Sequence, residues 1–247
     1  MHRNKQNPIL TRYDIPNLGP YLNDVSSVFN PGAIKVDNIY YLMIRVQNRA
    51  RETYLMMADS NDGINFKVRK SVVNFKGIEK LQNKIFHIYD PRITCINDVF
   101  FIMFAVDMDD GCRLGLAKSL DLHSFEFMGI ISDNDNRNGV LFPEKIDGNY
   151  IRLERPNLIT INGIVSGSTI CISKSKDLFK WDQTTDVISG NLHYWDELIG
   201  SGPPPIKTQE GWLLIYHGVA THFLTSNIYQ AGVLLLDLLD PTKVISR

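Results

Sequence analysis

A strand-and-turn unit that recurs four times is the feature that most restricts how this chain can fold. Each copy sets a polar turn before a short apolar run: Asp37-Asn38-Ile39-Tyr40-Tyr41-Leu42, Asn97-Asp98-Val99-Phe100-Phe101-Ile102, Asp147-Gly148-Asn149-Tyr150-Ile151 and Glu210-Gly211-Trp212-Leu213-Leu214. The spacing of roughly 50 to 60 residues is typical of a four-stranded propeller blade. In three copies a Ser-x-Asp corner with a later aromatic residue follows: Ser60 to Phe66, Ser119 to Phe125 and Ser175 to Trp181.

This pattern predicts an all-β protein whose residues 1–247 form a single β-propeller domain. One blade cannot cover both of its faces, so blades must pack radially against each other. An irregular β-sandwich is the alternative for the same short strands. The best helical candidate is the segment 76–84. The fourth unit has no aromatic corner and no obvious closing strand, so the sequence predicts about four blades and a propeller that is incomplete at its C-terminal end.

The composition excludes several classes of protein. The hydrophobic fraction of 44% and charged fraction of 21% are those of a globular protein, and the net charge of -1 gives no basis for binding nucleic acid or an anionic membrane. Cys95, Cys112 and Cys171 are widely spaced, which indicates neither a disulfide framework nor a zinc site. The first residues lack the apolar run of a signal peptide, so we expect a cytoplasmic protein.

A propeller gathers polar residues from successive blades at one end of its channel. The candidates include Arg45 in the first unit, Asp90 just before the second, Arg155 in the third and His217 in the fourth. Several cations beside one conspicuous carboxylate suit an oxyanion such as phosphate. A hydrolytic glycosidase normally needs two carboxylates, whereas phosphate is already a nucleophile. Glu52, Glu144 and Glu154 remain open as a second carboxylate.

Six colinear motifs resemble glycoside hydrolase family 130, the β-mannoside phosphorylases and their mannosidase relatives. They are Asn30-Pro31-Gly32-Ala33, Asp90-Pro91-Arg92-Ile93, Leu141-Phe142-Pro143-Glu144-Lys145, Arg155-Pro156, Gly202-Pro203-Pro204-Pro205-Ile206-Lys207 and Glu210-Gly211-Trp212-Leu213-Leu214-Ile215-Tyr216-His217-Gly218. The resemblance implies a five-bladed propeller type with its active site at the channel mouth. It also implies inverting phosphorolysis of a β-1,4-mannoside, which releases α-mannose 1-phosphate.

The resemblance also implies residue roles. Asp90 would be the general acid, passing its proton to the glycosidic oxygen through a sugar hydroxyl. Phosphate would be held by Arg137, Asn138, Arg155, Lys207 and His217. Asn30, Arg45, Arg51 and Tyr89 would contact the mannosyl unit or orient phosphate beside it.

Other readings of the chain stay open at this point. On the same fold it could be a β-mannosidase that uses water, or an inactive sugar-binding propeller. The expected partners are a β-mannoside oligosaccharide and inorganic phosphate as co-substrate, with no cofactor, metal, nucleic acid or membrane. A homo-oligomer, and glucose, N-acetylglucosamine or mannose as acceptor, are left undecided.

Overall fold

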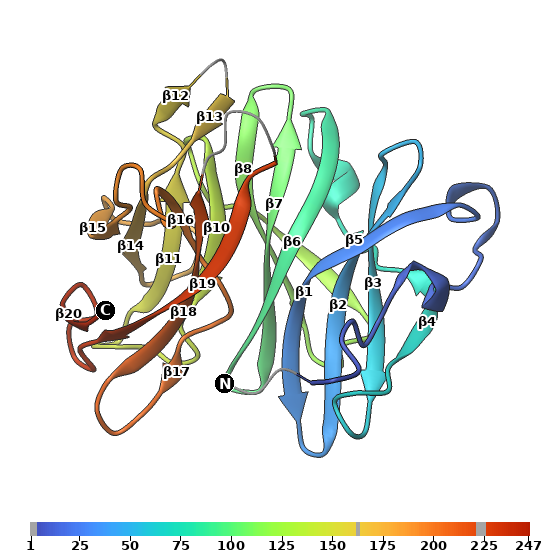
Figure 1. Cartoon of the computed structure of the whole chain (residues 1–247), viewed down its shortest axis with the longest axis horizontal. Helices are drawn as coiled ribbons and strands as arrows, with labels where there is room; N and C mark the ends of the chain where they lie inside the picture. The colour runs from blue at the N-terminus through green and yellow to red at the C-terminus, as the bar shows by residue number, and fades with distance from the viewer. Residues whose placement is uncertain (1–3, 162–163, 221–225) are drawn as a thin grey trace.

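A computed structural model describes residues 4–161, 164–220 and 226–247. Four main β-sheets follow one another along the chain (Figure 1). In the first two sheets the strands are β1 (Val25–Val36), β2 (Ile39–Asn48), β3 (Thr53–Ser60), β4 (Lys67–Val72), and then β6 (Ile85–Ile96), β7 (Val99–Met108), β8 (Gly111–Ser119), β9 (Phe125–Ile130). In the last two they are β10 (Asn136–Leu141), β11 (Tyr150–Pro156), β14 (Thr169–Ser175), β15 (Thr185–Ser189), and then β16 (Leu198–Ser201), β18 (Trp212–Ala220), β19 (Ile228–Leu236), β20 (Val244–Ser246).

Short elements connect and extend these sheets. The strand β5 (Phe75–Lys76) pairs in parallel with β9, β17 (Ile206–Lys207) pairs with β18, and β12 (Ile159–Ile161) pairs with β13 (Ile164–Ser166). Three short 3₁₀ helices span Arg12–Asp14, Gly19–Tyr21 and Ile78–Lys80. In the part of the chain that the structure describes, no helix is long and apolar enough to cross a membrane.

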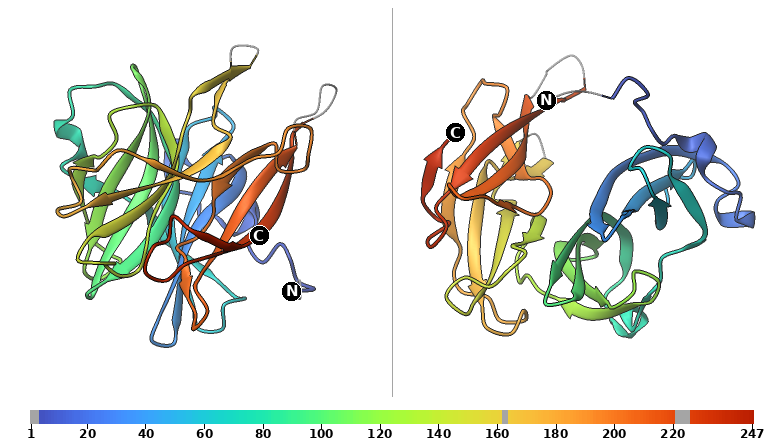
Figure 2. Two further views of the ribbon diagram at one scale, coloured as in Figure 1. Left: turned by 90° about the vertical axis from the view of Figure 1, so that its left-hand side faces the viewer. Right: turned by 90° about the horizontal axis from the view of Figure 1, so that it is seen from below.

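The sheets are the blades of a propeller, each with its first strand at the centre (Figures 1 and 2). Strand β1 contacts β6, β6 contacts β10, and β10 contacts β16, so these four strands surround a common channel. The prediction of an all-β propeller with about four blades in this chain is confirmed.

Apolar side chains fill the seams between neighbouring sheets. Met43 and Met57 of the first sheet pack with Phe104 of the second, and Leu153 of the third packs with Trp212 of the fourth. Because full burial of one such side chain contributes about 1.5–3 kcal/mol, these seams hold the sheets together. Side chains alternate between the two faces of a strand, so neighbouring apolar residues of β7 enter different seams: Phe104 packs toward the first sheet and Met103 toward the third.

An aspartate builds the outer corner of every sheet. In the first, Asp62 Oδ1 accepts backbone N–H bonds from Ile64 at 2.8 Å and Asn65 at 2.7 Å. Asp121 and Asp177 make the same pair of bonds in the next two sheets. These bonds lower the pKa of each carboxyl, since they favour its ionised form. The predicted Ser-x-Asp corners are therefore capped turns.

Three expectations about local structure need correction. The predicted units begin at the second strand of each sheet, because the central strand precedes the polar turn. The segment 76–84 is not a helix beyond Ile78–Lys80, since Lys76 pairs in β5 and Gly77 has a left-handed φ of 101°. The fourth sheet does close: β20 pairs with β19, and Asp237 forms its corner without the serine or the aromatic residue.

Candidate functional site

The central strands of three blades share one irregularity. Strands β1, β6 and β10 each carry a register shift against their neighbours, and Asn30, Asp90 and Asn138 lie there with φ of 44°, 52° and 55°. Asn and Asp tolerate this left-handed conformation better than most residues. Such β-bulges re-aim a side chain, here from the sheet toward the channel. Repetition of the bulge thus brings three polar groups together.

The second strand of each blade adds a side chain at the same level. Arg45 pairs with Phe29, Arg155 with Arg137, and His217 with Gly200. In the second blade the matching residue is Ala105, opposite Tyr89. The small alanine fits beside the Tyr89 ring, whose centre lies 4.7 Å from the Arg45 guanidinium and 5.9 Å from that of Arg137.

These side chains surround a cavity of about 1060 Å³ at one end of the channel. Nine of the ten predicted site residues line it: Asn30, Arg45, Arg51, Tyr89, Asp90, Arg137, Asn138, Arg155 and His217. These residues lie far apart in the sequence and meet because each of the four blades contributes at least one. Side chains alternate along β6 before Asp90. His87 and Tyr89 line the cavity, whereas Phe86 is exposed and Ile88 packs into the core.

Lys207, the tenth, does not line this cavity. Its Nζ lies 2.5 Å from Glu144 Oε1 and 5.6 Å from the centre of the Trp212 ring. The side chain lies in β17 and is half exposed. Lys207 therefore pairs with Glu144 and is not part of the cavity lining.

Asp90 is held on one oxygen. Its Oδ1 accepts hydrogen bonds from Asn30 Nδ2 at 3.0 Å and Arg45 Nη1 at 2.9 Å, and its side chain is 18% exposed. Arg92 Nη1 donates to the Asp90 carbonyl at 2.9 Å. Carboxylate and backbone are thus both fixed at the bulge.

A second carboxylate, Asp107, also lines the cavity and was missed by the sequence analysis. Its Oδ1 accepts the Tyr89 hydroxyl at 2.8 Å and lies 3.8 Å from Arg137. Its position as the first polar residue after the apolar run of β7 could have drawn attention to it. The three glutamates considered earlier lie outside the lining, with polar partners of their own: Glu52 with Asn48, Glu144 with Lys207, and Glu154 with Arg152.

The cavity is strongly cationic. Five arginines (45, 51, 92, 137 and 155) face two aspartates (90 and 107), so these groups give a net charge of 5 − 2 = +3. Burial, with Arg137 nearby, lowers the pKa of Arg155 to about 10. Burial, with Arg155 and Arg92 nearby, lowers the pKa of His217 to about 4, so this imidazole is neutral near pH 7.

Several polar atoms at this cavity lack partners. Among the described residues, seven buried side-chain atoms have no hydrogen bond, and six belong to the cavity lining: Arg45 Nε, Thr53 Oγ1, His87 Nδ1, Arg137 Nε, Asn138 Oδ1 and Arg155 Nε. Buried polar groups in native proteins are nearly always paired, so an exception calls for an explanation. Convergent guanidinium N–H groups suit a phosphate, and the other atoms suit sugar hydroxyls.

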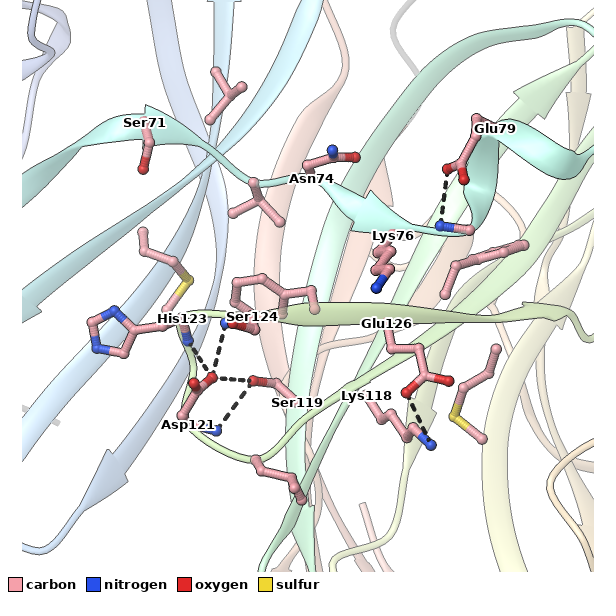
Figure 3. Close-up of a pocket in the computed structure, with 18 of the residues that line it drawn as sticks. Ser71, Asn74, Lys76, Glu79, Lys118, Ser119, Asp121, His123, Ser124 and Glu126 are labelled. Carbon is pink, nitrogen blue, oxygen red and sulfur yellow. Dashed lines mark hydrogen bonds and ion pairs between the residues drawn. The ribbon is translucent and has the colours of Figure 1, made fainter.

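A larger hollow of about 1180 Å³ lies between the first two blades, away from the channel (Figure 3). Figure 3 shows Asp121 bonded to Ser119 and to the backbone of His123 and Ser124, while Lys118 pairs with Glu126 at 3.2 Å. None of the unpartnered buried atoms of the described residues belongs to its lining. We therefore assign the candidate active site to the channel cavity. Across residues 4–161, 164–220 and 226–247, no three His, Cys, Asp or Glu side chains gather as a metal site.

Comparisons with known proteins identify the family of the chain. Residues 1–247 match a family model described as β-1,4-mannooligosaccharide phosphorylase. A 1,2-β-oligomannan phosphorylase of Thermoanaerobacter sp. is 33% identical over 90% of this chain and 73% of its own length. A β-1,4-mannooligosaccharide phosphorylase of Ruminococcus albus is 31% identical over 98% of this chain and 70% of its own. The structure of a β-1,2-mannobiose phosphorylase from Listeria innocua superposes with a TM-score of 0.83, at 26% identity, over 98% of this chain and 81% of that one.

Proposed function

The chain belongs to glycoside hydrolase family 130, and on that premise we propose that it is an inverting mannoside phosphorylase. It would cleave a β-mannosidic bond with inorganic phosphate and release α-mannose 1-phosphate and a shortened sugar. The observation that carries this proposal is the cluster of unpartnered guanidinium N–H groups beside Asp90 in a cavity of net positive charge. Phosphate is the co-substrate, and the proposed chemistry uses no cofactor.

The competing hydrolytic reaction needs a carboxylate that activates water. Asp107 is the other acid in the cavity, but its Oδ1 already binds the Tyr89 hydroxyl and lies near Arg137. These contacts suit an orienting role for Asp107 better than that of a free base. The same cations favour a nucleophile that carries negative charge, which supports phosphate over water.

The residue roles follow from the chemistry. Protonated Asp90 gives its proton to the glycosidic oxygen, through a hydroxyl of the bound sugar, as the C1–O bond breaks. A phosphate oxygen attacks C1 from the opposite face and forms the C1–O–P bond with inversion. The proton that the new phosphate monoester then loses restores Asp90.

Binding roles are divided between the two sides of the cavity. Arg137, Asn138, Arg155 and His217, from the third and fourth blades, hold phosphate. Asn30, Arg45 and Arg51, from the first blade, hold the mannosyl unit. Tyr89 supports both groups because its ring lies between the Arg45 and Arg137 guanidinium groups.

For the linkage we propose β-1,4. This choice is supported by the description of the matching family and by the Ruminococcus albus relative, which aligns with 98% of this chain. The names of other relatives refer to β-1,2 linkages. The two linkages place the leaving group differently at the mouth of the cavity, so a substrate panel separates them.

The test is release of mannose 1-phosphate from β-1,4- and β-1,2-mannobiose and from mannosyl-glucose, with and without phosphate. We expect phosphate-dependent turnover, an α-configured product by NMR, and preference for the β-1,4 compound. Asp90→Asn should lose about 10²–10⁴-fold in kcat while it keeps its thermal midpoint, since it lacks the proton but not the shape. Free mannose released equally well without phosphate would show a hydrolase instead.

A further inference from the structure

The strand registers divide the cavity into two levels. Arg45, Tyr89 and His217 lie at the inner level, with the bulges. Two residues farther along the same strands, toward the ends where β1 and β6 begin, lie Gln47 and His87. Thr53, at the start of β3, pairs with Gln47, so it belongs to this outer level as well. Strands β3 and β6 are in contact, and Thr53 and His87 both line the cavity.

Both residues carry polar atoms that lack partners. Thr53 Oγ1 and His87 Nδ1 are buried, and no residue in the described part of the chain bonds to them. Both residues belong to the first two blades, whereas Arg137 and Arg155 belong to the third. A hydroxyl and an imidazole nitrogen can exchange hydrogen bonds with sugar hydroxyls, which both donate and accept. Two such atoms in the cavity wall therefore mark a site for a neutral polyhydroxylated group.

The geometry of the proposed reaction indicates which sugar binds at Thr53 and His87. In an inverting displacement the nucleophile and the leaving group lie on opposite faces of the reacting sugar. The phosphate ligands come from the third and fourth blades, so the leaving group points toward the first and second. Asp90, the proton donor to that leaving group, stands on the second blade, three residues from His87 in β6.

We propose that His87 and Thr53 form the acceptor subsite, where they bind ring hydroxyls of the sugar that leaves. This inference rests on the proposed function, because it takes its direction from phosphate attack. His87 and Thr53 act on the leaving sugar alone, and neither touches phosphate or the mannosyl unit.

Kinetics in the synthetic direction test this assignment. The donor is α-mannose 1-phosphate, and the acceptor is the sugar that wild-type phosphorolysis releases. Loss of one hydrogen bond changes binding about 3- to 10-fold. We expect His87→Ala and the isosteric Thr53→Val each to raise the acceptor Michaelis constant by that factor and to leave the donor constant unchanged. His123→Ala, on an exposed corner of the same blade, is the matched control and should change neither.

Two failures can be told apart. If wild-type protein releases no mannose 1-phosphate from any mannoside, the proposed function falls and this inference falls with it. If wild type is active but both variants leave the acceptor constant unchanged, or raise donor and acceptor constants equally, the subsite assignment alone is overturned. Thr53→Val keeps the test valid should His87→Ala fail to fold, since it removes one hydroxyl at constant shape.

Discussion

Asp90, the proposed proton donor, is held by short hydrogen bonds, whereas the nearby Arg155 guanidinium is held by long ones. Asp90 takes two hydrogen bonds on Oδ1 from Asn30 and Arg45. Arg155 is buried, and in the part of the chain that the structure describes its guanidinium makes only long hydrogen bonds, at 3.4 Å to the Ile199 carbonyl and 3.4 Å to Asn157 Oδ1. A guanidinium so loosely bonded inside the protein is poised for an anionic partner.

Arg155 and Lys207 make a matched pair of substitutions. Arg155→Ala should raise the phosphate Michaelis constant at least about 10-fold, because a charged hydrogen bond is worth roughly 1.5–3 kcal/mol. Lys207→Ala should leave it unchanged, since that ammonium pairs with Glu144 outside the cavity. Steady-state kinetics over a range of phosphate concentrations measures both. A rise in Lys207→Ala equal to that in Arg155→Ala would contradict the placement of Lys207.

His217 makes the stability of the fold depend on pH. Its pKa is lowered to about 4 by burial and by Arg155 and Arg92, whereas an unfolded histidine titrates near 6.5. Between these values the unfolded chain binds the extra proton, so this contribution to stability is lost as the pH falls from about 7 to 4. Its size is at most about 3 kcal/mol, from a shift worth 1.36 kcal/mol per pKa unit.

The variant His217→Gln removes this titration. Thermal unfolding in phosphate-free buffer at pH 7 and pH 5 should show a larger acid-induced loss of stability in wild type than in the variant. Equal losses in the two proteins would mean that His217 is already protonated in the fold at pH 5.

At the scale of strands, the close approach of β1 to β6 sets the position of Asn30 against Asp90. A Cβ on Gly32 would stand 2.7 Å from the Pro91 carbonyl oxygen, which is backbone and cannot rotate away. We predict that Gly32→Ala separates the two strands, lowers kcat more than about 10-fold and lowers stability by roughly 1–3 kcal/mol.

Gly19→Ala is the control for this substitution. Its Cβ would meet no atom within 4 Å, but the residue has a left-handed φ of 77°. It should lower stability by about 1 kcal/mol through backbone strain and leave kcat unchanged. If Gly32→Ala keeps full kcat, the spacing of β1 and β6 does not control the site.

Local structure could be predicted where the residues of one short segment determine it by themselves. The corners of Asp62, Asp121 and Asp177 follow from serine, aspartate and an aromatic residue at fixed spacing. Asp237 forms the same corner without those neighbours, so its signal was too weak to find. The bulges could not be predicted either, because a register shift depends on the partner strand.

At the scale of the molecule, one arginine links blades that are not neighbours along the chain. Arg92 in β6 donates from Nε to the Gly202 carbonyl at 2.8 Å and from Nη2 to the Ser201 carbonyl at 3.0 Å. It also holds the Asp90 carbonyl. The second and fourth blades are thereby joined across the channel, close to Asp90, the proposed proton donor.

Arg92→Lys keeps the charge but cannot serve three carbonyls in fixed directions. We expect a loss of about 2–4 kcal/mol in stability and a fall in kcat that exceeds the change in either Michaelis constant. Unfolding and full kinetics measure these effects. The Arg113 guanidinium bonds to Cys112 and Asp110 of its own turn, so Arg113→Lys should change little. Equal effects of the two substitutions would remove Arg92 from the support of Asp90.

The propeller could be predicted because the strand-and-turn unit repeats at the length of one blade. Most candidate residues could be predicted as well, since each stood beside a recognisable strand or turn. Asp107 and the bonds of Arg92 could not, because they depend on which blades meet across the channel. Lys207 stood in a matching motif, yet its direction is decided by Glu144, 63 residues away along the chain.

The three bulges have a consequence for how substrate preference can change. Asn30, Asp90 and Asn138 are aimed by main-chain geometry, which is complete once the strands have paired, before any ligand arrives. Substitutions at the outer level of the cavity, where side chains such as Thr53 and His87 form the wall, should therefore leave the positions of these three residues unchanged. Substitutions in that wall can therefore change the preferred linkage while the residues at the bulges stay the same. Relatives named for β-1,2 and for β-1,4 mannosides agree with this.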